Sequence, residues 1–232
     1  MEGSPEAAQA GVSVEPVPPS GHESCGRRCW RDARAVPASG DETGFRILYV
    51  CTGNLCRSPL AERLTRSVLG PCPSIQVISA GTRAEPGMPM AERAQRALIR
   101  LGGDPGGFIS RRLTAELVAA ADLVLTATAE HRAESVTKHL PAATRVFTIV
   151  EFGALARAVS PAAVACHDDP VRRAHALMAE VRALRGLVHV DQPDIPDPYG
   201  RSWWAHRAAG RALAEALAVP LRLLTHPPVS FP

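Results

Sequence analysis

Short apolar runs alternate with longer amphipathic segments along the chain from Phe45 onward. Four of the runs are short and β-prone, as buried strands are, and they occupy residues 45–50, 75–79, 123–126 and 145–149. The segments between them space their apolar residues as helices do, and they occupy residues 58–70, 90–101, 114–121 and 130–139. Strands that alternate with helices predict an α/β fold, in which a parallel sheet has helices on both faces.

The region after the fourth strand is predicted to be helical. Residues 150–186 have helical character with an interruption before Pro170, and residues 187–200 hold repeated Asp and Pro turn signals typical of a loop. A final helix is expected over residues 202–218, and Pro220 is expected to end or kink it.

Composition divides the chain into three parts. Residues 1–44 are rich in Pro, Gly, Ser, Ala and charge and lack periodicity, which predicts a disordered extension. Residues 45–220 form the predicted domain, which includes a helical insertion at about 155–190, and residues 221–232 form a C-terminal tail. The chemistry of the protein is therefore expected within residues 45–220.

Charge and composition exclude several classes of protein. The net charge of +3 is small for this length and gives no case for nucleic-acid binding, which would need a concentrated basic face. The sequence has no apolar run of about 18 residues, so no membrane span is expected. Glu2 and Glu6 lie in an N-terminus without an apolar stretch, which does not fit a secretory signal. Six widely spaced cysteines favour reduced thiols and a cytoplasmic location over a disulfide framework.

The spacing Cys-x5-Arg, which can hold a cysteine nucleophile and a phosphate-binding arginine in one loop, occurs three times. The matches are Cys25 with Arg31, Cys51 with Arg57, and Cys166 with Arg172. The first lies in the predicted extension, and the third follows a helical stretch and contains two aspartates, which would repel phosphate. Only the second lies between a predicted strand and a predicted helix. Cys51 is therefore the candidate nucleophile, and Arg57 is its candidate phosphate clamp.

The segment after Cys51 has the features of a phosphate-binding loop. Gly53 permits a tight backbone, Asn54 tolerates a left-handed turn, and the loop contains no acid. Ser58 is expected to cap the following helix, and its hydroxyl could also donate to the Cys51 sulfur. The helix N-terminus favours both a bound anion and the thiolate, while Arg57 can clamp two phosphate oxygens. The expected phosphate-binding residues are Thr52, Gly53, Asn54, Leu55, Cys56 and Ser58.

At these residues the chain resembles the low-molecular-weight protein tyrosine phosphatase family. The match is nearly continuous from Leu48 to Glu62, and the resemblance extends to about Ala218. It implies a four-stranded parallel sheet flanked by helices on both faces. It also implies hydrolysis of phosphotyrosine in proteins, or of small aryl phosphates, through a cysteinyl-phosphate intermediate and without a metal or other cofactor.

The same resemblance assigns a general acid far from the loop. Asp-Pro occurs three times in the chain, but only Asp197 is followed, after Pro198, by an aromatic residue, Tyr199. The resemblance implies that Asp197 protonates the leaving oxygen while Cys51 attacks phosphorus, and that Tyr199 lines the substrate rim. General acid catalysis of this kind is worth about 10²–10⁴-fold.

Some positions depart from the family pattern or leave a role open. Phe108 stands where the family often has a histidine that supports the loop, and Gly200 stands where some members carry a second aromatic residue. The insertion at about 155–190 would either extend over one edge of the site or pack aside. Cys56 is the family's second loop cysteine, and it could form a reversible disulfide with Cys51 or simply fill the loop.

Two other functions are compatible with the same loop. An arsenate reductase of this fold would need additional, suitably placed cysteines, and downstream of the loop the chain offers only Cys72 and Cys166, which form no close pair in sequence. A non-catalytic phosphate-binding protein would not need the acid Asp197. The nucleophile, the arginine and the acid together favour a phosphatase over both.

Overall fold

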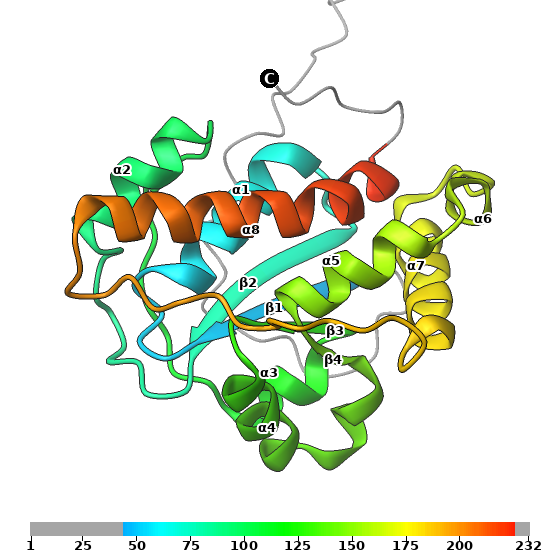
Figure 1. Cartoon of the computed structure of the whole chain (residues 1–232), viewed down its shortest axis with the longest axis horizontal. Helices are drawn as coiled ribbons and strands as arrows, with labels where there is room; N and C mark the ends of the chain where they lie inside the picture. The colour runs from blue at the N-terminus through cyan, green and yellow to red at the C-terminus, as the bar shows by residue number, and fades with distance from the viewer. Residues whose placement is uncertain (1–43, 226–232) are drawn as a thin grey trace, which may run out of the picture. The chain divides into compact units, whose positions relative to one another are not determined.

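The computed structural model describes residues 44–225, so the predicted extension, apart from Gly44, and residues 226–232 lie outside it. Four strands form one parallel sheet in the order β2-β1-β3-β4 (Figure 1). They are β1 (Phe45–Cys51), β2 (Ile75–Gly81), β3 (Leu123–Thr126) and β4 (Val146–Thr148). The predicted fold class and its four strands are confirmed.

Helices fill the connections between the strands and follow the last of them. In chain order they are α1 (Arg57–Leu69), α2 (Glu92–Arg100), α3 (Ala115–Ala120), α4 (Ala129–Lys138), the 3-10 helix η1 (Leu140–Arg145), α5 (Ile149–Ala158), α6 (Pro161–Ala165), α7 (Pro170–Leu184) and α8 (Trp203–Leu224). Over residues 44–225, no helix combines the length and the apolar character needed to cross a membrane.

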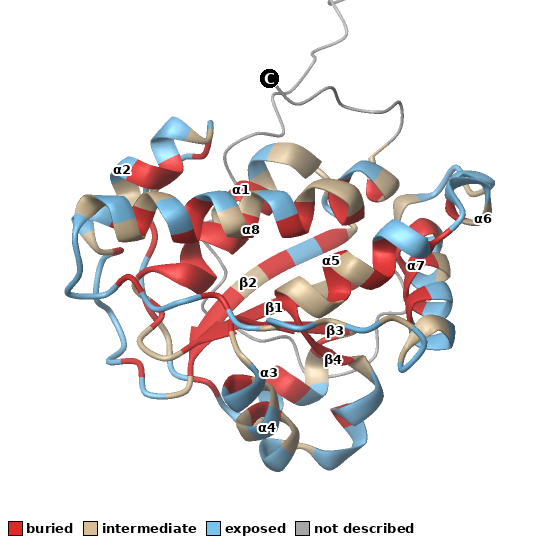
Figure 2. Ribbon diagram, in the orientation of Figure 1, coloured by how far each residue is buried: buried red, intermediate tan, exposed pale blue. Residues whose placement is uncertain are grey.

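Alternate residues of β1 belong to two separate apolar cores. Phe45, Ile47 and Tyr49 lie in the larger core, which side chains of α1, α2, α5, α7 and α8 complete. Leu48 and Val50 lie in the smaller core with side chains of α3, α4 and η1. Because successive side chains of a strand point to opposite faces, both faces of the sheet are covered, and Figure 2 shows the strands as almost wholly buried.

The carboxyl ends of β1, β2 and β3 meet at one edge of the sheet. Cys51 pairs with Gly81 at the end of β2, and Val50 pairs with Thr126 at the end of β3. In an open parallel sheet, the loops that leave this edge on neighbouring strands converge on a common site. The candidate nucleophile therefore lies where such a site is expected.

The last helix does not end at Pro220, and the domain does not stop there. α8 continues through Pro220 to Leu224, so residues 221–224 belong to a helix rather than to a tail. Leu221 and Leu224 are buried in the larger core. Burying two leucines contributes roughly 3–6 kcal/mol, which offsets the ~3 kcal/mol cost of a proline inside a helix.

The start of α7, within the segment predicted as an insertion at about 155–190, lies away from the carboxyl edge of the sheet. That segment forms the end of α5 and all of α6 and α7. His175 of α7 meets Phe45 edge to face, with ring centroids 5.1 Å apart. Phe45 is the first residue of β1 and Cys51 is the last, so this part of α7 lies at the opposite end of the strand from the candidate nucleophile.

Candidate active site

The loop between β1 and α1 is held from beneath by the end of β2. The backbone N–H of Thr82 donates to the carbonyl oxygen of Cys51 over 2.9 Å. Gly81 approaches the loop so closely that a Cβ there would lie 2.8 Å from the Asn54 nitrogen and would also overlap the Thr52 carbonyl oxygen. Only glycine fits this position without displacing the loop.

Asn54 organises the interior of the loop. Its φ of 54° is the left-handed conformation that the sequence predicted. Its Nδ2 donates to the hydroxyls of Ser58 and Ser79 over 2.9 and 2.8 Å, and its Oδ1 accepts from the Arg111 backbone N–H over 2.9 Å. Ser79 in turn donates to a carboxylate oxygen of Glu62 over 2.5 Å. The buried amide thus has a partner for each end, which fixes the loop before any ligand arrives.

Ser58 does not cap α1, contrary to the sequence expectation. The cap position belongs to Cys56, whose side chain makes no capping hydrogen bond within the described chain. The Ser58 hydroxyl instead lies 2.9 Å from the Cys51 sulfur and 3.3 Å from the Ala80 carbonyl oxygen, and it accepts the hydrogen bond from Asn54. The capping rule fails here because α1 already begins at Arg57, so Ser58 lies inside the helix and its hydroxyl is engaged by these other groups.

Arg57 joins the loop to a segment that lies far along the sequence. Its Nη1 donates to the carbonyl oxygen of Ile195 over 3.0 Å, and its Nη2 lies 2.7 Å from Oδ2 of Asp197. The same Nη2 donates to the Thr52 hydroxyl over 3.3 Å. The Arg57 side chain is only 4% exposed. The structure therefore brings together the arginine and the acid that the sequence singled out.

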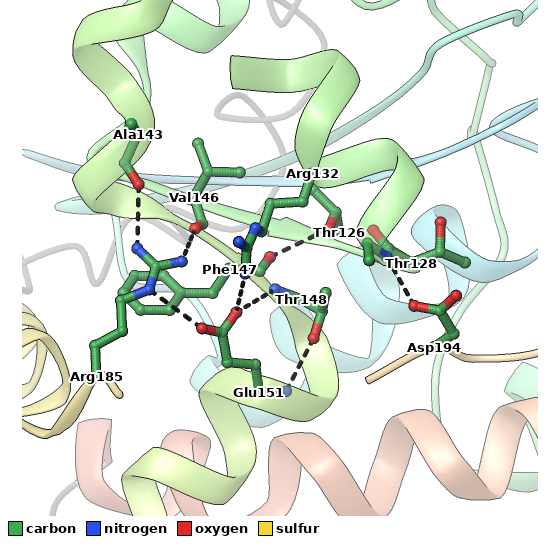
Figure 3. Close-up of polar contacts among 11 residues, drawn as sticks. Thr126, Thr128, Arg132, Ala143, Val146, Phe147, Thr148, Glu151, Arg185 and Asp194 are labelled. Atoms are coloured by element: carbon green, nitrogen blue, oxygen red, sulfur yellow. Dashed lines mark hydrogen bonds and ion pairs between the residues drawn. The ribbon is translucent and has the colours of Figure 1, made fainter. Parts of the chain in front are cut away.

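The segment that carries Asp197 is anchored just before the acid. Ile195 is buried, and its backbone N–H donates to the Ala127 carbonyl oxygen over 2.8 Å. Asp194 accepts from the Ala129 backbone N–H over 2.7 Å at the start of α4 (Figure 3). Both contacts lie just beyond the end of β3, beside the loop that follows β1. The anchor thus places Asp197 over the loop without burying it.

An ion-pair cluster braces the elements around this anchor (Figure 3). Glu151 accepts from Arg132 of α4 and from Arg185, which follows α7, over 3.2 Å in each case. Glu151 also forms a capping box with Thr148 at the start of α5. The cluster therefore ties the start of α5, α4 and the end of α7 to one another next to Asp194.

The acid and the predicted rim residue are the exposed part of the site. The Asp197 side chain is 47% exposed, and Tyr199 is 63% exposed. The Tyr199 backbone N–H donates to Oδ1 of Asp197 over 3.2 Å, while Pro198 between them is buried. Of the residues predicted for the site, these two are the ones that solvent, and therefore a substrate, can reach most easily.

His131 is a site residue that the sequence reasoning missed. Its Nε2 lies 2.9 Å from the Thr52 hydroxyl, and its Nδ1 lies 2.6 Å from the Thr128 hydroxyl. Burial, and secondly the charge of Arg57, lowers the pKa of His131 below its ordinary value. The signal was available in the sequence, because residues that follow neighbouring parallel strands share one edge of the sheet.

The site thus has a buried cysteine and a buried arginine in one loop, with an exposed aspartate above them. A known family has the sequence that forms this loop. The sequence model of the family described as low molecular weight phosphotyrosine protein phosphatase matches residues 46–185. The match covers more than half of the chain. The chain belongs to this family. It is therefore a phosphatase, and the resemblance seen in the sequence is confirmed.

Relatives in this phosphatase family carry two kinds of name. A probable low molecular weight protein-tyrosine-phosphatase, EpsP of Ralstonia nicotianae, is 37% identical over 105 residues, which is 45% of this chain and 70% of the relative. A protein-arginine-phosphatase of Bacillus subtilis is 37% identical over 111 residues, which is 46% of this chain and 71% of the relative. Sequence similarity alone therefore leaves the choice between the two phosphorylated residues open.

Solved structures of this phosphatase family share the fold. The YwlE arginine phosphatase from Geobacillus stearothermophilus superimposes with a TM-score of 0.55 and 27% identity, over 76% of this chain and 90% of that one. The tyrosine phosphatase Wzb from Escherichia coli K30, in complex with sulphate, gives a TM-score of 0.54 and 25% identity, over 74% of this chain and 92% of that one.

Phe108 leaves the support of the phosphatase loop to other residues. Its ring is buried, and the guanidinium of Arg63 lies 5.7 Å from the ring centroid. The polar support of Asn54 runs through Ser79 and Glu62. The loop network is therefore complete without a histidine at position 108.

The remaining cysteines of the described range are spread over the phosphatase domain. Burial, and secondly the neighbouring Cys51, raises the pKa of the Cys56 thiol to about 12, and this sulfur lies 3.9 Å from His206 Nε2. A reversible disulfide between Cys51 and Cys56 stays a prediction. Cys72 follows α1 and is partly buried, whereas Cys166 ends α6 and is exposed. Neither cysteine favours the arsenate reductase alternative.

Proposed function

We propose that this phosphatase hydrolyses phosphotyrosine in proteins through a phosphate ester of Cys51. The observation that carries the proposal is the contact between Arg57 and Asp197, at 2.7 Å, above the loop in which Ser58 lies 2.9 Å from the Cys51 sulfur. Nucleophile, phosphate clamp and acid thus share one site. The buried Nε of Arg57 has no hydrogen-bond partner within residues 44–225, and a bound phosphate oxygen would supply one.

In the first step the Cys51 thiolate attacks phosphorus and forms an S–P bond. The P–O bond to the tyrosine ring breaks, and its electron pair goes to the ring oxygen. Asp197 gives its proton to that oxygen, so tyrosine leaves as a neutral phenol. The loop N–H groups and Arg57 hold the other phosphate oxygens, whose charge they stabilise as the geometry at phosphorus changes.

In the second step the Asp197 carboxylate takes a proton from water. The water oxygen attacks phosphorus, the S–P bond breaks, and its electron pair returns to the Cys51 sulfur. Ser58 is positioned to donate a hydrogen bond to the sulfur as the thiolate leaves, because Oγ of Ser58 and Sγ of Cys51 lie 2.9 Å apart. Inorganic phosphate is released, and the enzyme returns to its starting state.

The residues at the mouth of the site favour an aryl substrate over phosphoarginine. Tyr199 exposes its ring two residues beyond the acid, and Leu55 adds a partly exposed apolar side chain to the loop itself. Both suit contact with a tyrosine ring. A phosphorylated guanidinium group needs hydrogen-bond acceptors, and Leu55, unlike Asp197, offers none in its side chain.

The test is phosphate release by the full chain and by the Cys51→Ser variant. We expect wild-type protein to hydrolyse p-nitrophenyl phosphate and a phosphotyrosine peptide, and we expect the variant to release phosphate only at the background rate. Acid quenching followed by mass spectrometry should find phosphate on Cys51. Retained turnover in Cys51→Ser would contradict the assignment of Cys51 as the nucleophile. If the enzyme hydrolysed a matched phosphoarginine peptide faster than the phosphotyrosine peptide, the proposed substrate would be wrong.

A further inference from the structure

A groove lies between α2 and the start of α8, outside the catalytic loop. It has a volume of about 420 Å³ and is lined by Arg93, Arg96, Ile99 and Arg100 of α2 and by Trp203 of α8. Figure 1 shows the two helices side by side at this end of the domain. Ile99 is 59% exposed, which is unusual for an aliphatic side chain on a helix that packs against the core. The groove therefore combines apolar and cationic surface.

The charge in this groove is strongly one-sided. Arg93, Arg96 and Arg100 recur at helical spacing on one face of α2. Glu92 pairs with Arg96 over 2.5 Å, which leaves an excess of two positive charges among these four side chains. The guanidinium of Arg100 lies 5.2 Å from the centroid of the Trp203 ring. The groove is thus suited to carboxylates, with an aromatic wall for the apolar part of a ligand.

The groove lies close to the rim of the active site. Arg93 Nη1 donates to the Arg201 carbonyl oxygen over 2.5 Å, and the Arg201 backbone N–H donates to the Pro198 carbonyl oxygen over 2.9 Å. Pro198 directly follows the acid. At the other side, the backbone N–H of Ala91, just before α2, donates to the Leu55 carbonyl oxygen in the catalytic loop over 2.9 Å. The groove therefore lies near the residues that would flank a bound phosphotyrosine.

We propose that this groove binds an acidic segment next to the phosphotyrosine of the protein substrate. The inference rests on the proposed function and adds the sequence context that the enzyme prefers. Arg93 and Arg100 are seven residues apart on α2, so they are separated by about 10 Å along the helix axis. An extended peptide covers that length in about three residues. The preferred substrate then carries a short run of Asp or Glu on one side of the phosphotyrosine.

The experiment compares three phosphotyrosine peptides with the full-length enzyme. One peptide has three glutamates on the N-terminal side of the phosphotyrosine, one has them on the C-terminal side, and one has glutamines on both. We expect one acidic peptide to give a kcat/KM about five- to tenfold above the neutral peptide, since exposed ion pairs contribute modestly. Raising the salt to about 0.5 M should reduce the difference to less than twofold. Equal kcat/KM for all three peptides would overturn the inference.

Reversing the charge of two groove arginines tests whether a preference for acidic peptides arises in the groove. In Arg96→Glu/Arg100→Glu the acidic advantage should disappear, and peptides with lysines in place of the glutamates should become the better substrates. Hydrolysis of p-nitrophenyl phosphate by this variant should stay within about twofold of wild type, which also shows that it is folded. Arg172→Glu, an exposed position on α7, is the matched control and should keep the acidic preference.

The two proposals fail separately. If the wild-type enzyme does not hydrolyse p-nitrophenyl phosphate, the proposed function is wrong. If the wild-type enzyme is active and the preference for acidic peptides persists in Arg96→Glu/Arg100→Glu, only the proposal that the groove binds the acidic segment is wrong.

Discussion

The two segments that meet at Arg57 are built in opposite ways. The loop after Cys51 is buried and cross-linked, with Asn54 bonded to three neighbours and Gly81 pressed beneath it. The segment that carries Asp197 is held by the buried Ile195 and then emerges, so that the acid itself is about half exposed. One half of the site is therefore buried and cross-linked, whereas the other holds an exposed acid between the buried residues Ile195 and Pro198.

This difference matches what each half has to do. A phosphate cradle stabilises charge best when its donors do not have to move during the reaction, which favours a rigid loop. A general acid has to reach a leaving oxygen whose position varies with the substrate, and it has to let the product out. The contrast predicts that changes in the loop act on chemistry and folding together, whereas a change of the exposed acid, Asp197, acts mainly on chemistry.

The largest effect is expected from Asp197→Asn, which removes the acid but keeps the shape of the segment. The value of kcat for a phosphotyrosine peptide should fall about 10²–10⁴-fold. KM should not rise, because Arg57 is released from its ion pair and stays available for phosphate. The melting temperature should change little, since the side chain is 47% exposed. A large loss of stability would contradict the division between the two halves.

Ser58→Ala should affect both chemistry and folding. The change removes the hydroxyl beside the Cys51 sulfur and leaves one donor of the buried Asn54 amide without its partner. We expect a loss of stability of about 1–3 kcal/mol, measured by urea unfolding, and at least a ~10-fold lower kcat. Ser67→Ala is the matched control, because Ser67 lies in the same helix and its hydroxyl donates to the Leu64 carbonyl oxygen within its own turn.

Ile195→Ala tests the anchor of the acid segment. Truncating this buried side chain should cost about 2–4 kcal/mol of stability. The value of kcat should fall severalfold, and it should fall more for leaving groups that need protonation than for p-nitrophenol. Ile195→Val should cost only about 0.5–1.5 kcal/mol and keep nearly normal activity. Equal losses for all leaving groups would show that the anchor does not position Asp197.

The smallest effect is expected from the titration of His131. Its pKa in the folded state is lowered, chiefly by burial, whereas in the unfolded chain it is about 6.5. The unfolded state therefore binds the proton first as the pH falls, so this contribution to stability is complete above about pH 6.5 and is lost progressively below it. His131→Gln should flatten the decline of stability between about pH 7 and 5.

Sequence patterns predicted most of the fold, because its determinants are local. The apolar run that ends at Cys51 and the helical spacing after Arg57 are properties of contiguous residues, and the four strands follow from such runs. Pro220 shows where a local rule fails, because the burial of Leu221 and Leu224 against distant elements outweighs the proline. The position of the helix end depends on tertiary packing, which cannot be predicted from neighbouring residues in the sequence.

The candidate site was predictable in part for the same reason. Cys51 and Arg57 lie in one loop, so their proximity could be inferred from spacing and context. The contacts of Arg57 with Ile195, and of His131 with Thr52, join residues that are far apart in the chain. From the sequence, the partners of Arg57 and His131 could be expected only among the residues at the shared edge of the sheet. Ser58 was placed correctly near the sulfur but assigned a capping role that the helix start does not use.

The close approach of Gly81 to the loop also bears on how this enzyme can evolve. A side chain at position 81 would displace the Thr52 carbonyl and the Asn54 nitrogen, so mutations there alter the reaction itself. Arg96 and Arg100 are exposed on the surface of α2, where substitutions leave the loop in place. Catalysis and substrate preference thus rest on separate sets of positions. A lineage can acquire new targets through surface mutations while it inherits the chemistry unchanged.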